Sequence, residues 1–429
     1  MSARYSKSEA LLERARRTVP LGTQTFSKSS VHYPLGVSPY FASRAKGSHL
    51  WDVDGNEYID FGNALCSVTL GYADPDVNMA VAQQLELGTL YTLTHELEAI
   101  VAEQIVDMVP SAERVRYGKN GSDATAGAIR VARASTGRDH VLVSGYHGWQ
   151  DWYIGSTTRD KGVPAATSAL THKFGYNDLD SVDRLVRQYP QDVAAIILEP
   201  MTIDPPAPGF LEGLRAIADR EGIVLVFDET ITGFRFANGG AQELFGVTPD
   251  LTTLGKGLAN GFPLSAVCGR ADLMSEMEEV FFSFTMGGET LSLAAAHAVL
   301  EKLVREPVVA QMRRQGQRIK DGLAERIRTH GVDRFCRVAG DPTWSFFLIS
   351  DCDGTTSFEL KTLWLQEMFA RGILSLGTHN MSYSHGDAEV DALLKAYDEV
   401  LPMLRDAVEN RAIRQYLKVE PLVPLFKVR

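Results

Sequence analysis

Two acids and one lysine are the residues of this chain best suited to catalysis. Asp228 and Glu229 close an apolar run at residues 223–227, and Lys256 lies between two glycines on a short loop. A lysine amine can form a Schiff base with the aldehyde of pyridoxal phosphate, while an aspartate can keep the pyridine nitrogen of that cofactor protonated. The 28 positions that separate Asp228 from Lys256 leave room for one helix and one further strand. The pairing predicts a pyridoxal phosphate site with Lys256 and Asp228 as its catalytic residues.

Three other segments could contact such a cofactor. Gly121 and Ser122 stand between an apolar run and a helical pattern, where backbone N–H groups at a helix start can bind a phosphate. Tyr146 follows another apolar run and could stack on the cofactor ring. Thr285, just before Gly287 and Gly288, is a second candidate for phosphate binding. The structural alternatives are an ordinary helix cap at Ser122 or Asp123, a buried aromatic turn, and a glycine-rich helix start.

The elements that must position these residues alternate along residues 70–300. Helical patterns at 77–87, 95–109, 123–134 and 209–221 are interleaved with short apolar runs at 115–117, 140–143, 193–198, 223–227 and 264–268. Such alternation predicts βαβ units, a mostly parallel sheet buried on both faces, and a site at the carboxyl ends of the strands. The expected class is therefore α/β.

The rest of the chain predicts a smaller α+β domain. An amphipathic helix at about 6–18, a Gly/Pro/Ser-rich stretch at 20–39 and a hairpin at 48–61 precede the large domain. A long charged helix at about 303–330, a strand at 344–350 and a helix at 358–371 follow it. We expect residues 70–300 to form the large domain and residues 301–429 the small one, with residues 1–69 contributing to the small domain and to a dimer interface.

Composition narrows the class of protein. The 429 residues are 45% hydrophobic and 23% charged, with a net charge of −11, which argues against binding to nucleic acid or to an anionic membrane. The four cysteines form no close pair, and neither they nor the histidines show metal-ligand spacing. With no signal-peptide pattern and no apolar run long enough to span a bilayer, we expect a cytoplasmic protein without a metal.

The motifs taken in order resemble those of class III aminotransferases, and most closely those of the glutamate-1-semialdehyde aminomutase group. The resemblance rests on residues 121–124, 146–148, 199–200, 227–235, 256 and 285–288, and it covers nearly the whole chain. It implies a fold type I homodimer with shared active sites. It also implies that Lys256 is the Schiff-base lysine, Asp228 the partner of the pyridine nitrogen, and Thr285 a contact to the phosphate in the neighbouring subunit. Arg235 matches a family arginine, which we interpret as structural.

The same comparison of motifs suggests where the substrate pocket departs from the aminomutases. Lys28 stands in place of an arginine for the substrate carboxylate, and Asp204 lies in a shortened stretch after Glu199 and Pro200. Glu289 replaces the asparagine of an Asn-Pro pair, and His379 lies in a segment that carries an acidic gating residue in the aminomutases. These four residues are the predicted substrate contacts.

The expected activity is transfer of an amino group from an amino-acid donor, such as L-glutamate, to a keto or aldehyde acceptor. The glycine-rich variant at 287–292 resembles enzymes of polysaccharide and amino-sugar biosynthesis, which suggests a keto-sugar acceptor. Two alternatives stay open: an intramolecular amino shift by an aminomutase, and a non-catalytic protein that keeps the fold.

Overall fold

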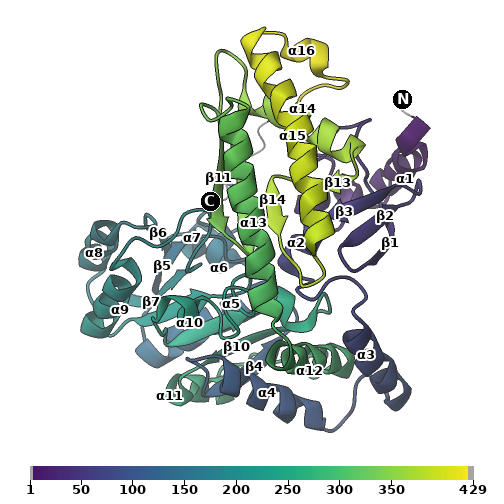
Figure 1. Cartoon of the computed structure of the whole chain (residues 1–429). Helices are drawn as coiled ribbons and strands as arrows, with labels where there is room; N and C mark the ends of the chain where they lie inside the picture. Colours follow the sequence, from purple (N-terminus) through teal and green to yellow (C-terminus); the bar gives the residue numbers. More distant parts are fainter. Residues whose placement is uncertain (1–2, 424–429) are drawn as a thin grey trace. The chain divides into compact units, whose positions relative to one another are not determined.

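The structure is a computed structural model that describes residues 3–423, and these divide into two compact units (Figure 1). Unit 1 contains residues 3–65, 70–74 and 310–423, and unit 2 contains residues 66–69 and 75–309. The boundary between the large unit and the C-terminal part of unit 1 falls between residues 309 and 310, whereas the sequence analysis placed this boundary at residue 300. No helix within residues 3–423 is both long and apolar enough to cross a membrane.

Unit 2 is built on a seven-stranded sheet with the order β4-β10-β9-β8-β7-β5-β6. Its strands are β4 (Arg114–Gly118), β5 (His140–Ser144), β6 (Thr171–Lys173), β7 (Val193–Leu198), β8 (Val224–Asp228), β9 (Leu251–Leu254) and β10 (Ser265–Gly269). Strand β10 is antiparallel to both of its neighbours, and the other neighbouring pairs are parallel. The predicted α/β class with a mostly parallel sheet is confirmed.

The helices of unit 2 lie before, between and after these strands along the chain. They are α3 (Pro75–Leu87), α4 (Glu96–Met108), α5 (Gly121–Thr136), α6 (Asp151–Ile154), α7 (Ala165–Ser168), α8 (Leu179–Gln188), α9 (Phe210–Glu221), α10 (Ala241–Phe245), α11 (Ala271–Met274) and α12 (Thr290–Arg305), with 3₁₀ turns η4 (Lys256–Ala259) and η5 (Ser275–Glu278). Between Asp228 and Lys256 the chain forms α10 and β9, which are the one helix and one strand expected from the spacing.

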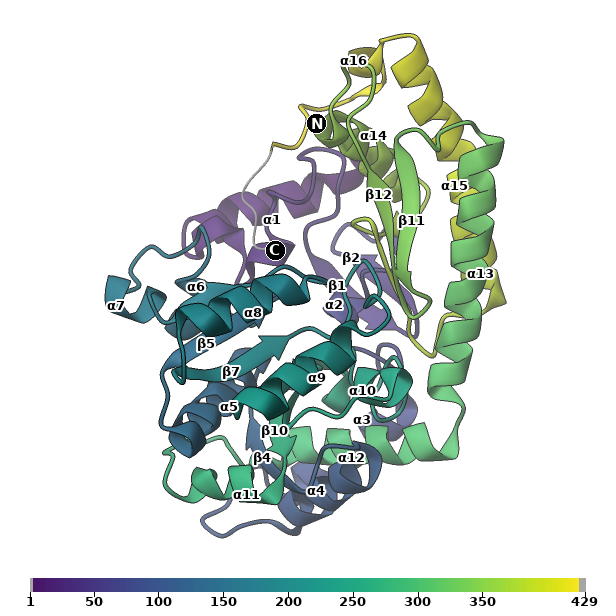
Figure 2. The ribbon, with the colours of Figure 1, turned by 90° about the vertical axis from the view of Figure 1, so that its left-hand side faces the viewer.

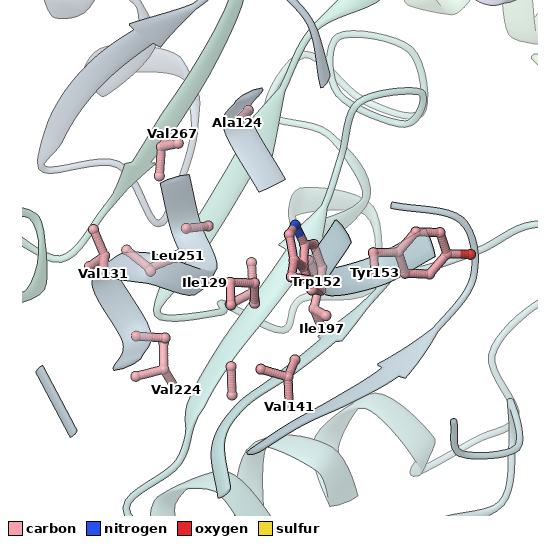
Figure 3. Packing of buried hydrophobic residues seen from close by; sticks show 14 of the residues in the cluster. Ala124, Ile129, Val131, Val141, Trp152, Tyr153, Ile197, Val224, Leu251 and Val267 are labelled. Atoms are coloured by element: carbon pink, nitrogen blue, oxygen red, sulfur yellow. The ribbon is translucent and has the colours of Figure 1, made fainter. Parts of the chain in front are cut away.

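Both faces of this sheet are buried under other elements. Successive residues of each strand point to opposite faces, so β5, β7 and β8 contribute to the apolar clusters on both faces. Val141 and Val143 pack on one side against α5 and α6, together with the residues labelled in Figure 3. Leu142 packs on the other side in a cluster contributed by α8 and α9, which Figure 2 shows in front of β5 and β7. Burial on both faces explains why the strands appear in the sequence as continuous apolar runs.

Unit 1 combines two small sheets with five helices. One sheet has the order β1-β2-β3-β13 and the other β11-β12-β14. The strands are β1 (Ala42–Lys46), β2 (His49–Asp52), β3 (Glu57–Asp60), β11 (Cys336–Asp341), β12 (Trp344–Ile349), β13 (Ile373–Leu374) and β14 (Thr378–Asn380). The helices are α1 (Ser6–Arg16), α13 (Val308–Thr329), α14 (Ser357–Ala370), α15 (Asp387–Glu409) and α16 (Ile413–Tyr416), with 3₁₀ turns η1 (Ala3–Tyr5), η2 (Pro20–Gly22) and η3 (Phe26–Lys28). The short helix α2 (Asn63–Cys66) crosses the division between the units.

Outside the large sheet, one expected helix is divided in two and one expected hairpin is present. The helix expected at 303–330 is split, since α12 ends at Arg305 and α13 begins at Val308. Pro307 stands in the gap, and a proline lacks the N–H that a continuous helix needs. The hairpin of β2 and β3 turns at Gly55, whose φ of 92° is a left-handed conformation that favours glycine.

Candidate active site

A cavity of about 490 Å³ lies where several strands of the large sheet end. Gly121, Ser122, Tyr146, Asp228 and Lys256 all line this cavity. They follow or close the strands β4, β5, β8 and β9, so segments far apart in the sequence meet at the carboxyl edge of the sheet. Open α/β sheets bind their ligands at this edge. The structure therefore brings together five of the six residues predicted to contact the cofactor.

Asp228, the last residue of β8, is buried and held by three donors. Its Oδ1 accepts hydrogen bonds from the Thr230 backbone N–H at 3.1 Å and from the Thr253 hydroxyl at 3.0 Å. Its Oδ2 lies 2.8 Å from Nδ1 of His147. Burial alone raises the pKa of Asp228, but the hydrogen bond and charge of His147 and the bonds from Thr230 outweigh it, so the pKa lies below its usual range. The carboxylate is thus ionised and rigidly oriented toward the cavity.

His147 is the partner of Asp228 that the sequence analysis missed. Its ring is fully enclosed between Trp152 and Tyr153, with the Tyr153 ring edge-on at 5.2 Å between centroids. Its second nitrogen, Nε2, is buried without a hydrogen-bond partner among the described residues. The sequence offered one signal, since His147 directly follows Tyr146 in the motif, but nothing in the spacing said which acid it would meet.

Lys256 begins the turn η4 directly after β9, and its backbone has a φ of 44°. This left-handed conformation is costly for a residue with a side chain, and such strain concentrates at functional sites. The surrounding turn is buried, with Gly257, Leu258 and Ala259 all enclosed. A rigid turn therefore fixes the direction from which the amine enters the cavity.

The start of α5 supplies free backbone donors to the same cavity. The Asn120 side chain caps the helix by accepting from the Asp123 N–H, and the Asp123 carboxylate accepts in turn from the Asn120 backbone N–H. The structural alternative of a cap at Ser122 or Asp123 does not hold, because the cap is Asn120, two or three residues earlier. Gly121 and Ser122 consequently occupy the first turn, where N–H groups have no partner within the helix and suit a phosphate.

Gly148 is required by the close approach of the loop after β5 to this helix start. The Trp149 backbone N–H donates to the Ser122 hydroxyl at 3.1 Å. A Cβ on Gly148 would stand 2.2 Å from that hydroxyl oxygen, and the φ of 102° also disfavours any other residue. The contact packs the loop that carries Tyr146 and His147 against the helix start.

Two further glutamates border the site, with different roles. Glu199, at the end of β7, lines the cavity and accepts a hydrogen bond from the Tyr146 N–H at 2.9 Å, which fixes the backbone of the aromatic residue. Glu229 points away into the interior, where it accepts from the backbones of Ala241 and Gln242 and from the Thr232 hydroxyl. The second acid of the Asp-Glu pair is thus structural.

Tyr146 and Thr285 are placed differently. Tyr146 lines the cavity and is 41% exposed, and its ring lies edge-on to Tyr153 with 5.7 Å between centroids. Its ring is therefore partly accessible from the cavity. Thr285 is exposed and does not line the cavity. Its contact to the phosphate of a neighbouring subunit stays a prediction.

The predicted substrate contacts do not gather in one place. Glu289 caps α12 through the Leu291 and Ser292 N–H groups and forms an ion pair with Lys119 at 3.2 Å, so its carboxylate already has several donors. Asp204 is exposed on the loop after β7 and does not line the cavity. Lys28 lines a separate cleft of about 440 Å³ in unit 1. Substrate binding by Glu289, Asp204 and Lys28 stays a prediction.

His379 requires a correction. It is fully buried in β14, with Nδ1 at 3.0 Å from the Ser345 hydroxyl and Nε2 at 2.9 Å from the Tyr397 hydroxyl. Both ring nitrogens are therefore used inside unit 1, and the predicted role as a substrate contact is not supported by this placement. Arg235 is also fully buried, and it donates to the Cys66 carbonyl at 3.3 Å, in keeping with the structural role expected of it.

Comparison with known proteins supports the family resemblance inferred from the motifs. The family described as aminotransferase class-III matches residues 32–343. A glutamate-1-semialdehyde 2,1-aminomutase from Syntrophobacter fumaroxidans is 37% identical over 423 residues, which covers 91% of this chain and 96% of that protein.

Solved structures with a similar fold support the same family resemblance. An omega-transaminase from Sphaerobacter thermophilus superposes with a TM-score of 0.84 at 30% identity, covering 94% of this chain and all of that one. The FumI protein of Sphingopyxis sp. MTA144, solved in its internal aldimine form with pyridoxal phosphate, gives a TM-score of 0.87 at 28% identity, covering 97% and 99% of the two chains.

Proposed function

Because this chain belongs to the class III aminotransferases, enzymes that depend on pyridoxal phosphate, we propose that it moves an amino group from an amino-acid donor to a separate keto or aldehyde acceptor. The observation that carries the proposal is the cavity in which the Lys256 amine and the buried, ionised Asp228 meet. A protein that only kept the fold would have no need of either.

The residues that line the cavity fit pyridoxal phosphate. The start of α5 offers N–H groups at Gly121 and Ser122 for the phosphate, and Tyr146 offers an aromatic ring at the cavity wall. Asp228 offers a carboxylate for the pyridine nitrogen, and Lys256 offers the amine. The phosphate, the pyridine nitrogen and the aldehyde of the cofactor therefore each have a counterpart of complementary chemistry.

The mechanism follows from the roles of these side chains. When bound, the cofactor supplies an aldehyde carbon that captures amines and a ring that accepts an electron pair. Asp228, kept ionised by His147 and Thr230, would hold the proton on the ring nitrogen. Lys256 would hold the cofactor through its aldehyde and would take up and return the proton at the substrate α-carbon.

We propose L-glutamate as the donor and a polar carbonyl compound, such as a keto-sugar, as the acceptor. Support comes from the polar side chains that share the cavity wall with the cofactor contacts, among them Ser67, Asn120 and Glu199. Apolar residues are present at the same wall, with Ile231 and Phe262 among them. Such a wall suits a substrate that carries hydroxyl groups on a compact carbon frame.

A second candidate is an intramolecular amino shift of the aminomutase type. The 37% identity to an enzyme named as an aminomutase favours it. The two candidates differ in stoichiometry, because a transaminase releases one oxo acid from the donor for each product and a mutase releases none.

The experiment follows the nitrogen atom. Cofactor-loaded enzyme is incubated with L-glutamate labelled with ¹⁵N and a panel of keto-sugars, and the products are analysed by mass spectrometry. A labelled product together with an equal amount of 2-oxoglutarate supports the transaminase. Conversion of glutamate-1-semialdehyde to its isomer without any external donor would instead establish the mutase.

We further propose that the enzyme works as a homodimer. Large apolar side chains are exposed near Thr285 in the sequence and between α3 and α4: Leu87 is 71% exposed, Leu93 82% and Phe281 79%. Exposed apolar residues gathered in two segments are typical of an interface rather than of a monomer surface. Light scattering after size-exclusion chromatography tests the proposal, since a mass of about one chain, 47.1 kDa, contradicts it.

A further inference from the structure

A second cleft of about 230 Å³ lies in unit 1, between strand β12 and helix α14. Its lining is mainly apolar, and includes Phe347 and Ile349 from the strand and Phe358 and Trp364 from the helix. One charged side chain, Lys361, shares the wall with them. All of these residues belong to unit 1, whereas the cavity of Lys256 is formed by unit 2.

The Lys361 amine has an unusual environment. Among residues 3–423 it makes no hydrogen bond and no ion pair, whereas several charged groups of unit 1, such as Arg313 and Arg371, have an opposite charge beside them. Burial lowers the pKa of Lys361, because removal from water disfavours the ammonium form. The charged group known to act on it electrostatically is His32, whose own pKa is lowered by burial and by Lys361. The nearest acid along the chain, Glu359, already accepts from the Thr356 N–H and hydroxyl and pairs with Arg414 at 3.3 Å.

A second donor belongs to the same wall. The indole Nε1 of Trp364 is buried and has no hydrogen-bond partner among the described residues. The Trp364 ring packs against Phe347 with 5.5 Å between centroids. Because buried polar groups in proteins are nearly always satisfied, the unpaired indole N–H of Trp364 and the half-buried, unpaired amine of Lys361 on this wall favour an acceptor.

We propose that this cleft is a ligand site for a small carboxylate with an apolar body, such as an aryl-substituted acetate. The carboxylate accepts from the Lys361 amine, and the apolar part lies against Phe347, Phe358 and Trp364. A neutral polar ligand would leave the amine without a counter-charge, and an inorganic anion would leave the aromatic walls exposed to water. A ligand that has both a carboxylate and an apolar body gains a charge-assisted hydrogen bond and the burial of apolar surface.

Phenylacetate is the probe for a first test by calorimetry. It is titrated into the cofactor-loaded wild type, into Lys361→Met, and into Lys395→Met, which removes an exposed lysine of the neighbouring helix α15 as a matched control. Wild type and Lys395→Met should bind one phenylacetate per chain with the same affinity, and Lys361→Met at least tenfold more weakly. Equal binding to all three proteins, or no binding to any, overturns the proposal. Thermal unfolding of each variant shows whether it is folded.

A labelling experiment places the ligand. Reductive methylation of the cofactor-loaded wild type at neutral pH, followed by peptide mass spectrometry, should modify Lys361, and phenylacetate should protect it while leaving Lys395 unprotected. Protection by inorganic phosphate at the same concentration would contradict the carboxylate class, because the apolar walls would then contribute nothing. A lack of protection by phenylacetate contradicts the site itself.

Discussion

The hydrogen bond between His147 and Asp228 leads to the most detailed prediction, because one pair of variants can isolate it. His147→Leu removes the donor that lies 2.8 Å from Asp228 Oδ2. His147→Asn has nearly the same size as leucine but keeps an N–H group close to the position of Nδ1. The two variants create similar space in the interior and differ mainly in the hydrogen bond.

The expected magnitude follows from the character of that bond. A hydrogen bond to a buried charged group contributes about 1.5–3 kcal/mol. If the whole contribution is needed to keep Asp228 ionised against the ring nitrogen, amino transfer should slow by about 10- to 150-fold in His147→Leu. Without His147, burial becomes the dominant influence and raises the pKa of Asp228, so the defect should be larger at pH 6 than at pH 9.

The assay is a single-turnover half-reaction with L-glutamate, followed by absorbance of the cofactor at several pH values. His147→Asn should recover most of the wild-type rate, and thermal unfolding serves as the control for folding. Equal rates in the leucine and asparagine variants, or a leucine defect that does not change with pH, would refute the role of the bond and leave His147 as a packing residue.

Three other predictions concern stability. Glu229→Gln should lower the free energy of unfolding by about 2–4 kcal/mol in urea titrations. The reason is that an amide N–H₂ would then face the Ala241 or Gln242 backbone N–H, each of which donates to the carboxylate in the wild type. An unchanged urea midpoint contradicts this. His379 and His385 have pKa values lowered by burial to about 3 and about 4, against about 6.5 when unfolded. Their stabilisation is present above pH 6.5 and is lost as the pH falls toward the folded values, so unfolding at pH 5 should cost about 3–4 kcal/mol less than at pH 7. In His385→Asn this difference should shrink by about half, and an unaltered difference counts against the assignment. Lys361→Met should raise the unfolding free energy by about 1 kcal/mol, since it removes a desolvated amine that has no counter-charge, and a lower value argues against that environment.

The sequence predicted the parts of the site that depend on local order along the chain. Asp228 and Lys256 were found because an acid at the end of an apolar run and a lysine between glycines are local patterns. The strands of the large sheet were found because burial on both faces makes them continuous apolar runs.

The parts that depend on pairing between strands or loops were not found. Thr253 reaches Asp228 because the two residues are register partners in β8 and β9, and no sequence pattern states that register. His147 reaches the same carboxylate through a loop conformation set partly by Gly148. His379 was assigned to substrate from its place in a resemblance, but β14 turns it into the interior of unit 1, where Ser345 and Tyr397 use both nitrogens.

Lys361 shows a related limit. In the sequence it is one lysine near the start of a helix, where a Thr-Glu capping box marks the N-terminus but gives no sign of burial. Its removal from water depends on β12 and α14 packing beside each other, which the sequence does not specify residue by residue.

The most direct test of the central claim is the visible spectrum of the purified enzyme with pyridoxal phosphate, before and after L-glutamate, beside Lys256→Ala. The account predicts a yellow absorbance band in wild type that glutamate converts to the spectrum of the pyridoxamine form, and a variant that does not make this conversion at a comparable rate. A wild-type protein that shows no cofactor band after loading, or a Lys256→Ala variant that reacts as fast as wild type, would contradict it.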